Sequence, residues 1–482
     1  MPTTHRPSRR RARAARVTWL ATGLVAVALG GMVTLGPGAV RAADPTPSPT
    51  PSPRPVRPLV PVATLKPRAT PSPTPVPTPT PGVTQLGANV TFYGRGYGHG
   101  VGLSQYGAKG RALAGQTTEQ ILAHYYQGAT AGSIALDTPI RVRVLKAFTA
   151  TTTTPLVLFG RGGTWTMDGV TASFPKDAKV TVTPSTSGGT TTWKVKVTSS
   201  GGTVLRDAAT TGFRMRPAAT ATLLQVFSKP SSYDTYRGVI RVRLDTTAPT
   251  LNVINELPLE TYLRGVVPAE MPSSWPAAAL RAQTIAARSY AAGRIRGPDY
   301  YYDVSDDTSS QVYRGVLGEK AQTNAVVKAT ASVVLKSGSS IANTLFHSAG
   351  GGATEHNENV FVSATGAKVA SPVTYLRGSS DRRADGTSYD DGSPYATWKT
   401  KAYTLARLSL MFATDARTSV GTLTRLDLSR RGVSGRLIRV TLVGTAGTKV
   451  VSGDVFRSVF NAARPVGDPS MRSTLVDTRP VP

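Results

Sequence analysis

Residues 257–292 read LPLETYLRGVVPAEMPSSWPAAALRAQTIAARSYAA and predict two helices that meet at one acidic residue, Glu270. Pro258 suits the start of the first helix, because the first amide of a helix has no partner within it and proline has no amide hydrogen. Pro268 is expected to end this helix, since a proline inside a helix removes a hydrogen bond and crowds the preceding turn.

The second helix is predicted over residues 277–292, which contain eight alanines. Ser273 or Ser274 is expected to cap this helix, with Pro276 at its start. The small alanine side chains allow other backbone segments to pack close to it. Glu270 is therefore expected in the corner between the two helices.

The surroundings of Glu270 in the sequence are apolar, with Val267, Met271 and Trp275 nearby and a proline on either side. An apolar environment disfavours the charged form of a carboxyl group and so raises its pKa. A carboxyl group with a raised pKa suits a proton donor. The alternative is that Glu270 is a helix-boundary residue that faces water and has no chemical role.

Four segments of the chain form a combined pattern. The first is YLRGVVPAEMPSSWPAAALRAQTIAARSYA at 262–291. The others are TSSQVYRGVLGE at 308–319, FHSAGGGATEHNENVF at 346–361 and the glycine-rich GRGYGHGVGLSQYGAKG at 94–110. Together they resemble the SpoIID/LytB family, named after stage II sporulation protein D, and the first resembles the core signature of the family. The resemblance extends over roughly residues 92–478.

The resemblance implies an α+β fold in which antiparallel β-meander or sheet subdomains accompany a helical catalytic core. It also implies a lytic transglycosylase that cleaves peptidoglycan glycan strands, expected to be free of stem peptides, and leaves 1,6-anhydro-muramyl ends. Glu270 is expected to act first as the acid and then as the base. The residues expected to bind the substrate are His99, Gln105, Arg288, Ser289, Tyr290, His347 and Ser348.

The family also has an amidase-enhancer branch, which implies an alternative function. In that hypothesis the chain is a non-catalytic wall-binding protein that enhances or positions an N-acetylmuramoyl-L-alanine amidase. A basic surface and glycine-rich stretches suit this role, whereas the presence of Glu270 favours the enzyme. A structural spacer is a third hypothesis, and the family name does not by itself imply a role in sporulation.

The order of the segments departs from the family. In the family members compared, the glycine-rich segment and its following helix come at the C-terminal end, whereas here they occupy residues 94–126. This order predicts a circular permutation, which is tolerated when the old chain ends lie close together at the surface. A strand at Val90–Tyr93 is therefore expected beside a strand at about residues 471–477. His99 is then expected to reach the groove that contains Glu270.

A zinc site at His347, His356 and Glu355 is a further hypothesis. A separation of nine positions between the histidines is not a common zinc spacing, and the chain has no cysteine. Relatives that bind zinc use cysteine with histidine, so no metal and no cofactor is predicted. The acidic residues between 303 and 307 are interpreted as a solvated loop, with a cation site or a second catalytic acid as alternatives.

The first 82 residues predict an exported protein. Residues 1–43 of the 482 begin with an arginine-rich stretch, continue with an apolar run at 17–33 and end with small residues that suit a cleavage site. This is the pattern of a secretory signal peptide. An uncleaved membrane anchor at 17–33 is the alternative, because this run is close to spanning length. Residues 44–82 alternate proline with threonine, serine and valine, which favours an extended linker into a cell wall. The expected location is the cell wall or the extracellular space.

The chain is strongly basic, with a formal net charge of +29. Residues 83–482 hold 45 basic and 26 acidic residues, so this part alone carries +19. Such a charge attracts polyanions. Export argues against nucleic acid, and the sequence contains no nucleic-acid-binding pattern and no phosphate-binding loop. The predicted partners are therefore peptidoglycan glycan strands and anionic wall polymers.

Four regions are predicted after the linker. Residues 83–130 hold the glycine-rich segment and a helix at about 118–126, and residues 131–236 form a β-rich subdomain with glycine-containing turns. Residues 237–396 form the catalytic core, and residues 397–482 form a C-terminal α+β part of the same domain. Helices near 403–413 and 453–463 are expected in this last part.

Overall fold

The computed structural model describes residues 83–480, and the structural statements that follow concern those residues. The chain divides into two units, Met1–Thr64 and Leu65–Pro482, so the described residues all lie in the second unit. The predicted signal or anchor at 1–43 and the linker at 44–82 lie outside the described residues. None of the helices found between residues 83 and 480 has the length and apolar character that a membrane crossing requires.

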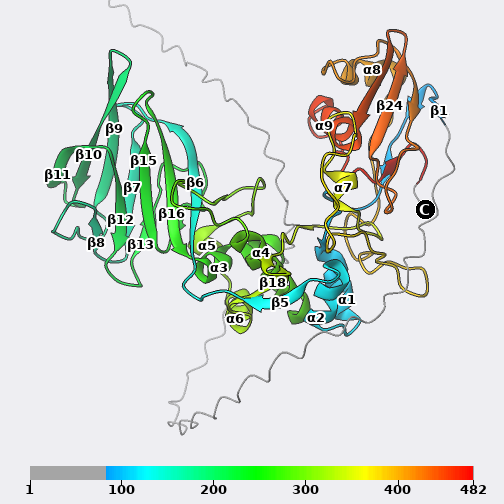
Figure 1. Ribbon diagram of the computed structural model, residues 1–482. Helices are drawn as coiled ribbons and strands as arrows, with labels where there is room; N and C mark the ends of the chain where they lie inside the picture. Colours follow the sequence, from blue (N-terminus) through cyan, green and yellow to red (C-terminus); the bar gives the residue numbers. More distant parts are fainter. Residues whose placement is uncertain (1–82, 481–482) are drawn as a thin grey trace, which may run out of the picture. The chain divides into compact units, whose positions relative to one another are not determined.

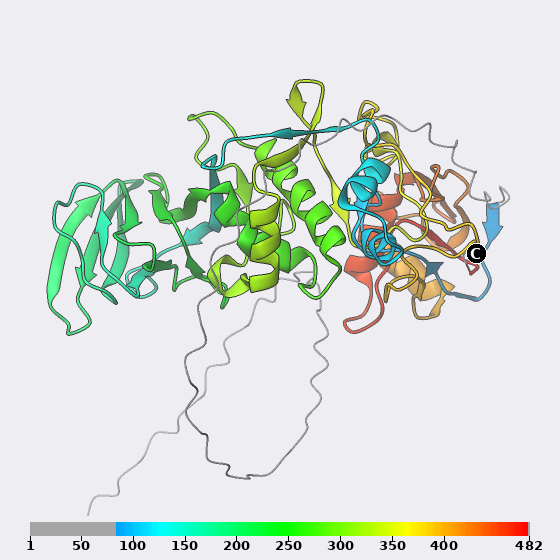
Figure 2. The same ribbon diagram turned by 90° about the horizontal axis from the view of Figure 1, so that it is seen from below.

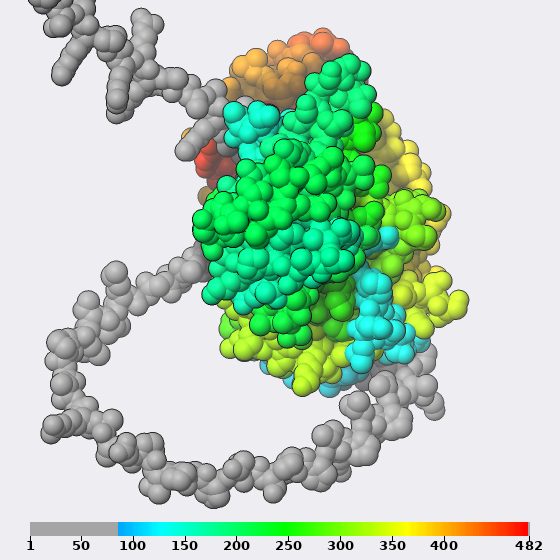
Figure 3. Space-filling view, turned by 90° about the vertical axis from the view of Figure 1, so that its left-hand side faces the viewer, coloured from blue at the N-terminus to red at the C-terminus, as the bar shows by residue number. Residues whose placement is uncertain are grey.

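The described part combines helices with mainly antiparallel sheets, which confirms the predicted α+β class (Figure 1). Two six-stranded sheets share one apolar core in the β-rich region, and residues of this region form much of the surface seen in Figure 3. The first sheet has the order β11 (Val204–Thr210), β10 (Thr190–Thr198), β9 (Lys179–Ser187), β7 (Leu156–Arg161), β13 (Leu223–Gln225) and β14 (Thr235–Tyr236). The second has the order β17 (Val304–Ser305), β6 (Pro139–Thr149), β16 (Thr250–Pro258), β15 (Val239–Leu244), β12 (Gly212–Pro217) and β8 (Trp165–Met167).

Alternation along the strands explains why the two sheets pack together. In β10, Trp193, Val195 and Val197 are buried while the lysines between them are exposed, as the period of two in a strand requires. The second sheet also takes strands from both sides of the boundary expected between residues 236 and 237, because β15 pairs with β12. The strand β16 then continues directly into the helix that ends at Glu270.

The two predicted helices around Glu270 are present as α3 (Leu259–Glu270) and α4 (Ala277–Ala292), which pack against each other (Figure 2). The prediction that Pro268 ends the first helix is wrong, because α3 continues for two residues beyond it. Only one hydrogen bond is lost at Pro268, and the packing of the buried apolar face of α3 outweighs that loss. The prediction of a serine cap is also wrong, since Pro276 is the N-cap and no side chain caps α4.

The glycine-rich segment leads into a helix that the sequence did not predict, α1 (Gln105–Leu113), followed by the predicted one, α2 (Thr118–Tyr125). Two glycines inside α1 disfavour a helix by intrinsic propensity. The packing requires at least one of them, because a Cβ atom on Gly110 would lie 1.8 Å from the carbonyl oxygen of Tyr389.

Short elements connect these helices to the C-terminal region. A three-stranded sheet contains β5 (Thr130–Ser133), β18 (Val333–Ser337) and β19 (Ser340–Ile341). The short strands β4 (Leu103–Ser104) and β20 (Phe346–His347) pair in parallel. The remaining helices of the region are α5 (Gly315–Gly318), α6 (Ala321–Ala329) and α7 (Asn357–Val360).

The C-terminal region has its own apolar core. Its four-stranded sheet has the order β1 (Val83–Gln85), β23 (Leu423–Asp427), β24 (Arg439–Gly444) and β25 (Gly447–Ser452). The helices α8 (Leu405–Phe412) and α9 (Gly453–Ala463) lie at the positions predicted for them. Phe92 contributes to this core from the N-terminal side, with its ring 5.7 Å from that of Phe456 and 5.6 Å from that of Phe460.

The strand pairing that the permutation requires is confirmed. The strand β3 (Tyr93–Gly94) lies between β21 (Trp398–Lys399) and β26 (Val476–Asp477), and Tyr93 pairs with Asp477. A second short strand, β2 (Asn89–Val90), pairs with β22 (Tyr403–Thr404). The N-terminal segment is thus joined to the C-terminal end of the described chain by backbone hydrogen bonds.

Candidate active site

Glu270 is the last residue of α3, and the short connection to α4 follows it, so the residue lies at the predicted corner. Its side chain is partly buried and has two hydrogen-bond donors. The backbone amide of Val312 donates to Oε1, and the side-chain amide of Gln105 donates to Oε2, each over 3.3 Å. Neither donor is charged, and neither comes from the two helices that form the corner.

Burial raises the pKa of the Glu270 carboxyl group to about 7. The hydrogen bonds from Val312 and Gln105 and the positive charge of Arg314 act to lower the pKa, but by less than burial raises it. A group with a pKa near 7 holds its proton in a large fraction of molecules at neutral pH. A raised pKa of this kind is what a general acid needs.

A chain of buried polar groups fixes the segment that carries the Val312 amide. The hydroxyl of Tyr262 on α3 donates to Gln311 Oε1 over 3.1 Å, and Gln311 Nε2 donates to the carbonyl of Ala287 on α4 over 3.3 Å. The hydroxyl of Tyr313 donates to Asn255 Oδ1 over 3.0 Å. Residues 311–313 are therefore held on both sides of Val312, which keeps its amide directed at Glu270.

Gln105 reaches Glu270 because the glycine-rich segment is joined to the segment at 346–361. Ser104 caps α1 by accepting from the Gly107 amide and also accepts from the Gly350 amide over 3.0 Å. The Tyr106 amide donates to the carbonyl of Ser348 over 2.9 Å. At Gly102 only glycine fits, because its φ is +69° and a Cβ atom on Gly102 would lie 2.0 Å from the carbonyl oxygen of Leu345.

Asp381 joins α1 and α2 through contacts with side chains of both helices. It is fully buried and accepts from Arg111 Nε over 3.0 Å and Nη2 over 2.8 Å, and the hydroxyl of Tyr125 lies 2.9 Å from both of its oxygens. Burial acts to raise the pKa of Asp381, but a hydrogen bond from His124 and the charge of Arg111 lower it to about 2. The carboxylate therefore stays ionised and holds the helix that carries Gln105.

His99 and His347 lie next to each other, with ring centres 5.4 Å apart. The Val101 amide donates to His99 Nδ1 over 3.0 Å, and His347 Nδ1 lies 3.2 Å from the carbonyl of Val101. Burial lowers the pKa of His99 to about 4 and that of His347 well below its ordinary value, so both rings are neutral at pH 7. The structure describes no contact of either ring with Glu270, and groove lining by these two residues stays a prediction.

The predicted substrate ligands on α4 make contacts inside the protein. Arg288 is fully buried and donates to both carboxylate oxygens of Glu260 over 2.8 Å, with its other donors directed at Thr330 and at backbone carbonyls. The hydroxyl of Ser289 donates to the carbonyl of Ile285 and accepts from the Leu335 amide. These contacts stabilise the packing of α4, and substrate binding by the two residues stays a prediction.

Tyr290 senses the charge of Glu270, whereas Ser348 contacts the glycine-rich segment. Burial is the main cause that raises the pKa of the Tyr290 hydroxyl, and the Glu270 carboxylate contributes in the same direction. The guanidinium of Arg294 lies 3.3 Å from the centre of the Tyr290 ring. Ser348 accepts from Tyr106 through its carbonyl, and its side chain is partly buried. Their binding roles also stay predictions.

The residues proposed for zinc do not fit a metal site. Glu355 is buried and accepts from the Val433 amide and from the amide and hydroxyl of Ser434. His356 Nδ1 accepts from the Gly378 amide over 2.8 Å. Within residues 83–480 there is no group of three or more histidine and acidic side chains that could hold a metal ion.

The acidic residues between 303 and 307 are separated by their partners. Asp303 pairs with Arg141 over 2.6 Å, Asp306 pairs with Lys229, and Asp307 binds the amide and hydroxyl of Ser309. None of these contacts involves Glu270.

A chelator is therefore expected to leave any activity of the site unchanged. The test is to measure activity before and after treatment with a chelator and after addition of zinc. A loss that zinc restores would contradict the assignment of these residues to structural contacts.

Comparisons with known proteins find similarity in the region of the sequence that contains Glu270. The family model described as stage II sporulation protein matches residues 247–336, a shorter range than the resemblance at 92–478. An uncharacterised protein of Brachyspira hyodysenteriae is 37% identical over 114 residues, which are 23% of this chain and 31% of that protein. The amidase enhancer of Bacillus subtilis is 34% identical over 154 residues, which are 30% of this chain and 21% of the enhancer.

The stage II sporulation protein D of Bacillus subtilis is 52% identical over 42 residues, which are 9% of this chain and 12% of that protein. The matched segments thus span less than a third of each of these relatives. No solved structure is detectably similar to the chain. Residues 247–336, which contain the Glu270 corner, match the SpoIID domain model, so this region of the chain is similar to the SpoIID/LytB family.

Proposed function

We propose that the protein is an exported lytic transglycosylase that cleaves the glycan strands of peptidoglycan, with Glu270 as its single acid and base. The observation that carries the proposal is a lone carboxyl group with a pKa of about 7 whose described contacts are all non-acidic. Most glycosidases that use water place two carboxyl groups at the scissile bond, one on each side. A transglycosylase requires one, because the sugar supplies its own nucleophile.

The reaction proceeds in two proton transfers. The protonated Glu270 donates its proton to the glycosidic oxygen as the bond from that oxygen to C1 of the muramyl residue breaks. The resulting carboxylate then accepts the proton of the 6-hydroxyl while O6 forms a bond to C1, which closes the anhydro ring. No water is consumed, and the carboxyl group regains its proton.

The two donors of Glu270 suit this cycle. The Val312 amide and the Gln105 side chain each bind a different oxygen, so they restrict the rotation of the carboxyl group in both protonation states. Because both bonds are long and uncharged, they stabilise the carboxylate weakly and leave the raised pKa in place. A salt bridge at the same position would keep the group ionised and remove the acid.

The substrate is proposed to be glycan free of stem peptides. The test incubates the purified protein with peptide-free glycan strands and, separately, with intact peptidoglycan, and measures the soluble saccharides. Release from the peptide-free strands supports the proposal. A protein that releases no saccharide from either substrate would contradict it.

Activity is expected to fall as the pH rises above about 7, because Glu270 must be protonated to start the reaction. Well above its pKa, each further unit of pH reduces the protonated fraction about tenfold. The measurement is kcat/KM on peptide-free strands from pH 5 to pH 9. A rate that rises steadily through pH 8 would contradict the role of Glu270 as the acid.

The second candidate is a non-catalytic enhancer of an N-acetylmuramoyl-L-alanine amidase, which the similarity to the amidase enhancer of Bacillus subtilis favours. The two functions separate in one assay. The amidase is given peptidoglycan with the wild-type protein or with the Glu270→Gln variant. Equal stimulation by both proteins, without release of saccharides, would support the enhancer and exclude the transglycosylase.

A further inference from the structure

One face of the second six-stranded sheet is unusually rich in arginine. Side chains alternate between the two faces of a strand, so that Val142, Phe213 and Val242 point into the core while their neighbours point outward. The outward positions of β6, β12 and β15 carry Arg141, Arg143, Arg214, Arg216, Arg241 and Arg243. We call these six residues the arginine face.

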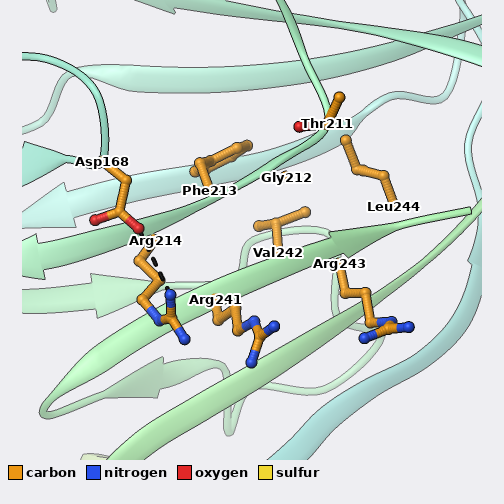
Figure 4. A pocket seen from close by; sticks show the side chains of 9 residues that line it. All are labelled: Asp168, Thr211, Gly212, Phe213, Arg214, Arg241, Val242, Arg243 and Leu244. Carbon is orange, nitrogen blue, oxygen red and sulfur yellow. Dashed lines mark ion pairs between the residues drawn. The ribbon is translucent and has the colours of Figure 1, made fainter. Parts of the chain in front are cut away.

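Part of the arginine face lines a pocket of about 330 Å³. Figure 4 shows Arg214, Arg241 and Arg243 projecting to the same side of the sheet, with Asp168 paired to Arg214. A neighbouring pocket of about 550 Å³ shares the lining residues Asp168 and Phe213. This second pocket also contains Arg206, whose Nε atom is buried and has no hydrogen-bond partner within the described part of the chain.

The strand register places like charges opposite each other. Arg214 on β12 pairs directly with Arg241 on β15, and such pairs destabilise a sheet unless other charges offset them. Glu256 offers part of that offset, with one oxygen 2.8 Å from Arg214 Nε and the other 3.6 Å from Arg241 Nη1. Asp168 lies 2.9 Å from Arg216 and 3.7 Å from Arg214.

Acidic partners do not balance the arginine face. Asp303, Glu256 and Asp168 are the carboxylates that pair with its six guanidinium groups in the described structure. Arg243 has no acidic partner in residues 83–480, and its guanidinium lies 4.7 Å from the centre of the Tyr301 ring. Arg143 likewise has no acidic partner there and lies 4.1 Å from the centre of the Tyr302 ring. The face therefore keeps a surplus of three positive charges.

We propose that the arginine face binds the phosphate groups of a phosphodiester-linked anionic polymer of the cell wall. The planar guanidinium group binds phosphate through two parallel hydrogen bonds, which is a stronger contact than lysine makes. Outward positions repeat about every 7 Å along a strand and about every 5 Å between strands. An open surface with this repeat suits successive charges along an extended polymer better than one small anion.

This binding goes beyond the proposed reaction and does not depend on it. The arginine face lies on the β-rich region and includes no residue assigned to the Glu270 site. It would retain the protein on the wall while the SpoIID domain acts on glycan. The two activities can therefore be measured separately in one protein.

The experiment measures binding of the purified full chain to a synthetic poly(glycerol phosphate) chain at several salt concentrations. The Arg241→Gln/Arg243→Gln double variant is compared with a Lys194→Gln/Lys196→Gln double variant. The control removes the same charge from exposed positions of β10, in the other sheet of the same region. Thermal unfolding of each variant verifies the fold, and Arg214 still pairs with Glu256 when Arg241 is replaced.

The arginine variant is expected to bind about tenfold more weakly, and its affinity is expected to depend less on salt, since fewer phosphates are neutralised. The lysine variant is expected to change affinity by less than about threefold, because screening weakens distant charges. Equal losses in the two variants would overturn the proposal and leave only a general attraction to the +19 charge. Binding to phosphatidylglycerol vesicles, with none to the polymer, would overturn it in favour of a membrane surface.

Discussion

Replacement of Glu270 by glutamine is expected to reduce saccharide release from peptide-free glycan strands by about a hundredfold to ten-thousandfold. Glutamine has nearly the same shape and can still accept the hydrogen bond from Val312, but it has no acidic proton to give to the glycosidic oxygen. The measurement is the initial rate of release by the two proteins at pH 6. The matched control is Glu119→Gln, at an exposed position in the first turn of α2, which is expected to retain the wild-type rate.

The Glu270→Gln variant is expected to be at least as stable as the wild type above neutral pH. Burial raises the pKa of Glu270 from 4.5 to about 7, so the folded state binds more protons than the unfolded state between these two values. The wild type therefore loses stability as the pH rises through this window, by up to about 3 kcal/mol, and the variant does not. Melting temperatures at pH 5 and pH 8 test this. A variant that melts far below the wild type at both values would make its inactivity uninformative.

Replacement of Asp381 by alanine is expected to destabilise the protein by about 3–5 kcal/mol. The reason is that Arg111, whose side chain is 7% exposed, would keep its charge in the interior without its carboxylate partner. Asp381→Asn retains an oxygen acceptor for Tyr125 and is expected to lose less. Denaturant unfolding at pH 7 measures both changes.

Asp385→Ala is the control for this series. Asp385 is exposed in the same loop and accepts from the amide and hydroxyl of Thr387, so its replacement is expected to change stability far less than replacement of the buried Asp381. Since Asp381 holds the helix that carries Gln105, its alanine variant should also lower the rate of saccharide release. A stable and fully active Asp381→Ala protein would contradict the assignment of the glycine-rich segment to the active site.

Local signals in the sequence were sufficient to predict the Glu270 corner. Prolines mark its helix starts, and the alanine-rich run over residues 277–292 is helical as expected. Local rules failed where packing dominates. Pro268 stays inside α3 because one lost hydrogen bond is outweighed by a buried apolar face. The helix α1 contains glycines that local propensity disfavours, and at Gly110 the backbone of Tyr389 leaves no room for a larger side chain.

The pairing of segments that are distant in the sequence was predicted from the order of the motifs and not from local strand or helix propensity. The displaced glycine-rich segment predicted that the chain near residue 93 would pair with the chain near residue 477, and β3 does pair with β26. Gln105 was expected to line the groove, and its hydrogen bond to Glu270 places it beside the carboxyl group. The Val312 amide was not predicted, because a backbone donor leaves no trace in the residue type. The contact of Arg288 with Glu260 was not predicted either. The match of Arg288 to the family motif indicated substrate binding, but its guanidinium donates hydrogen bonds to both carboxylate oxygens of Glu260.

The mass of the products formed from peptide-free glycan strands tests the central claim most directly. A transglycosylase that uses Glu270 alone closes an anhydro ring on the muramyl residue, so each product is lighter by one water than the corresponding hydrolysis product. Mass spectrometry of a digest by the wild-type protein is predicted to find muramyl ends in the anhydro form, which are absent from a digest by Glu270→Gln. Reducing muramyl ends, or the same products from both proteins, would contradict the claim that Glu270 acts as the single acid and base of a transglycosylase.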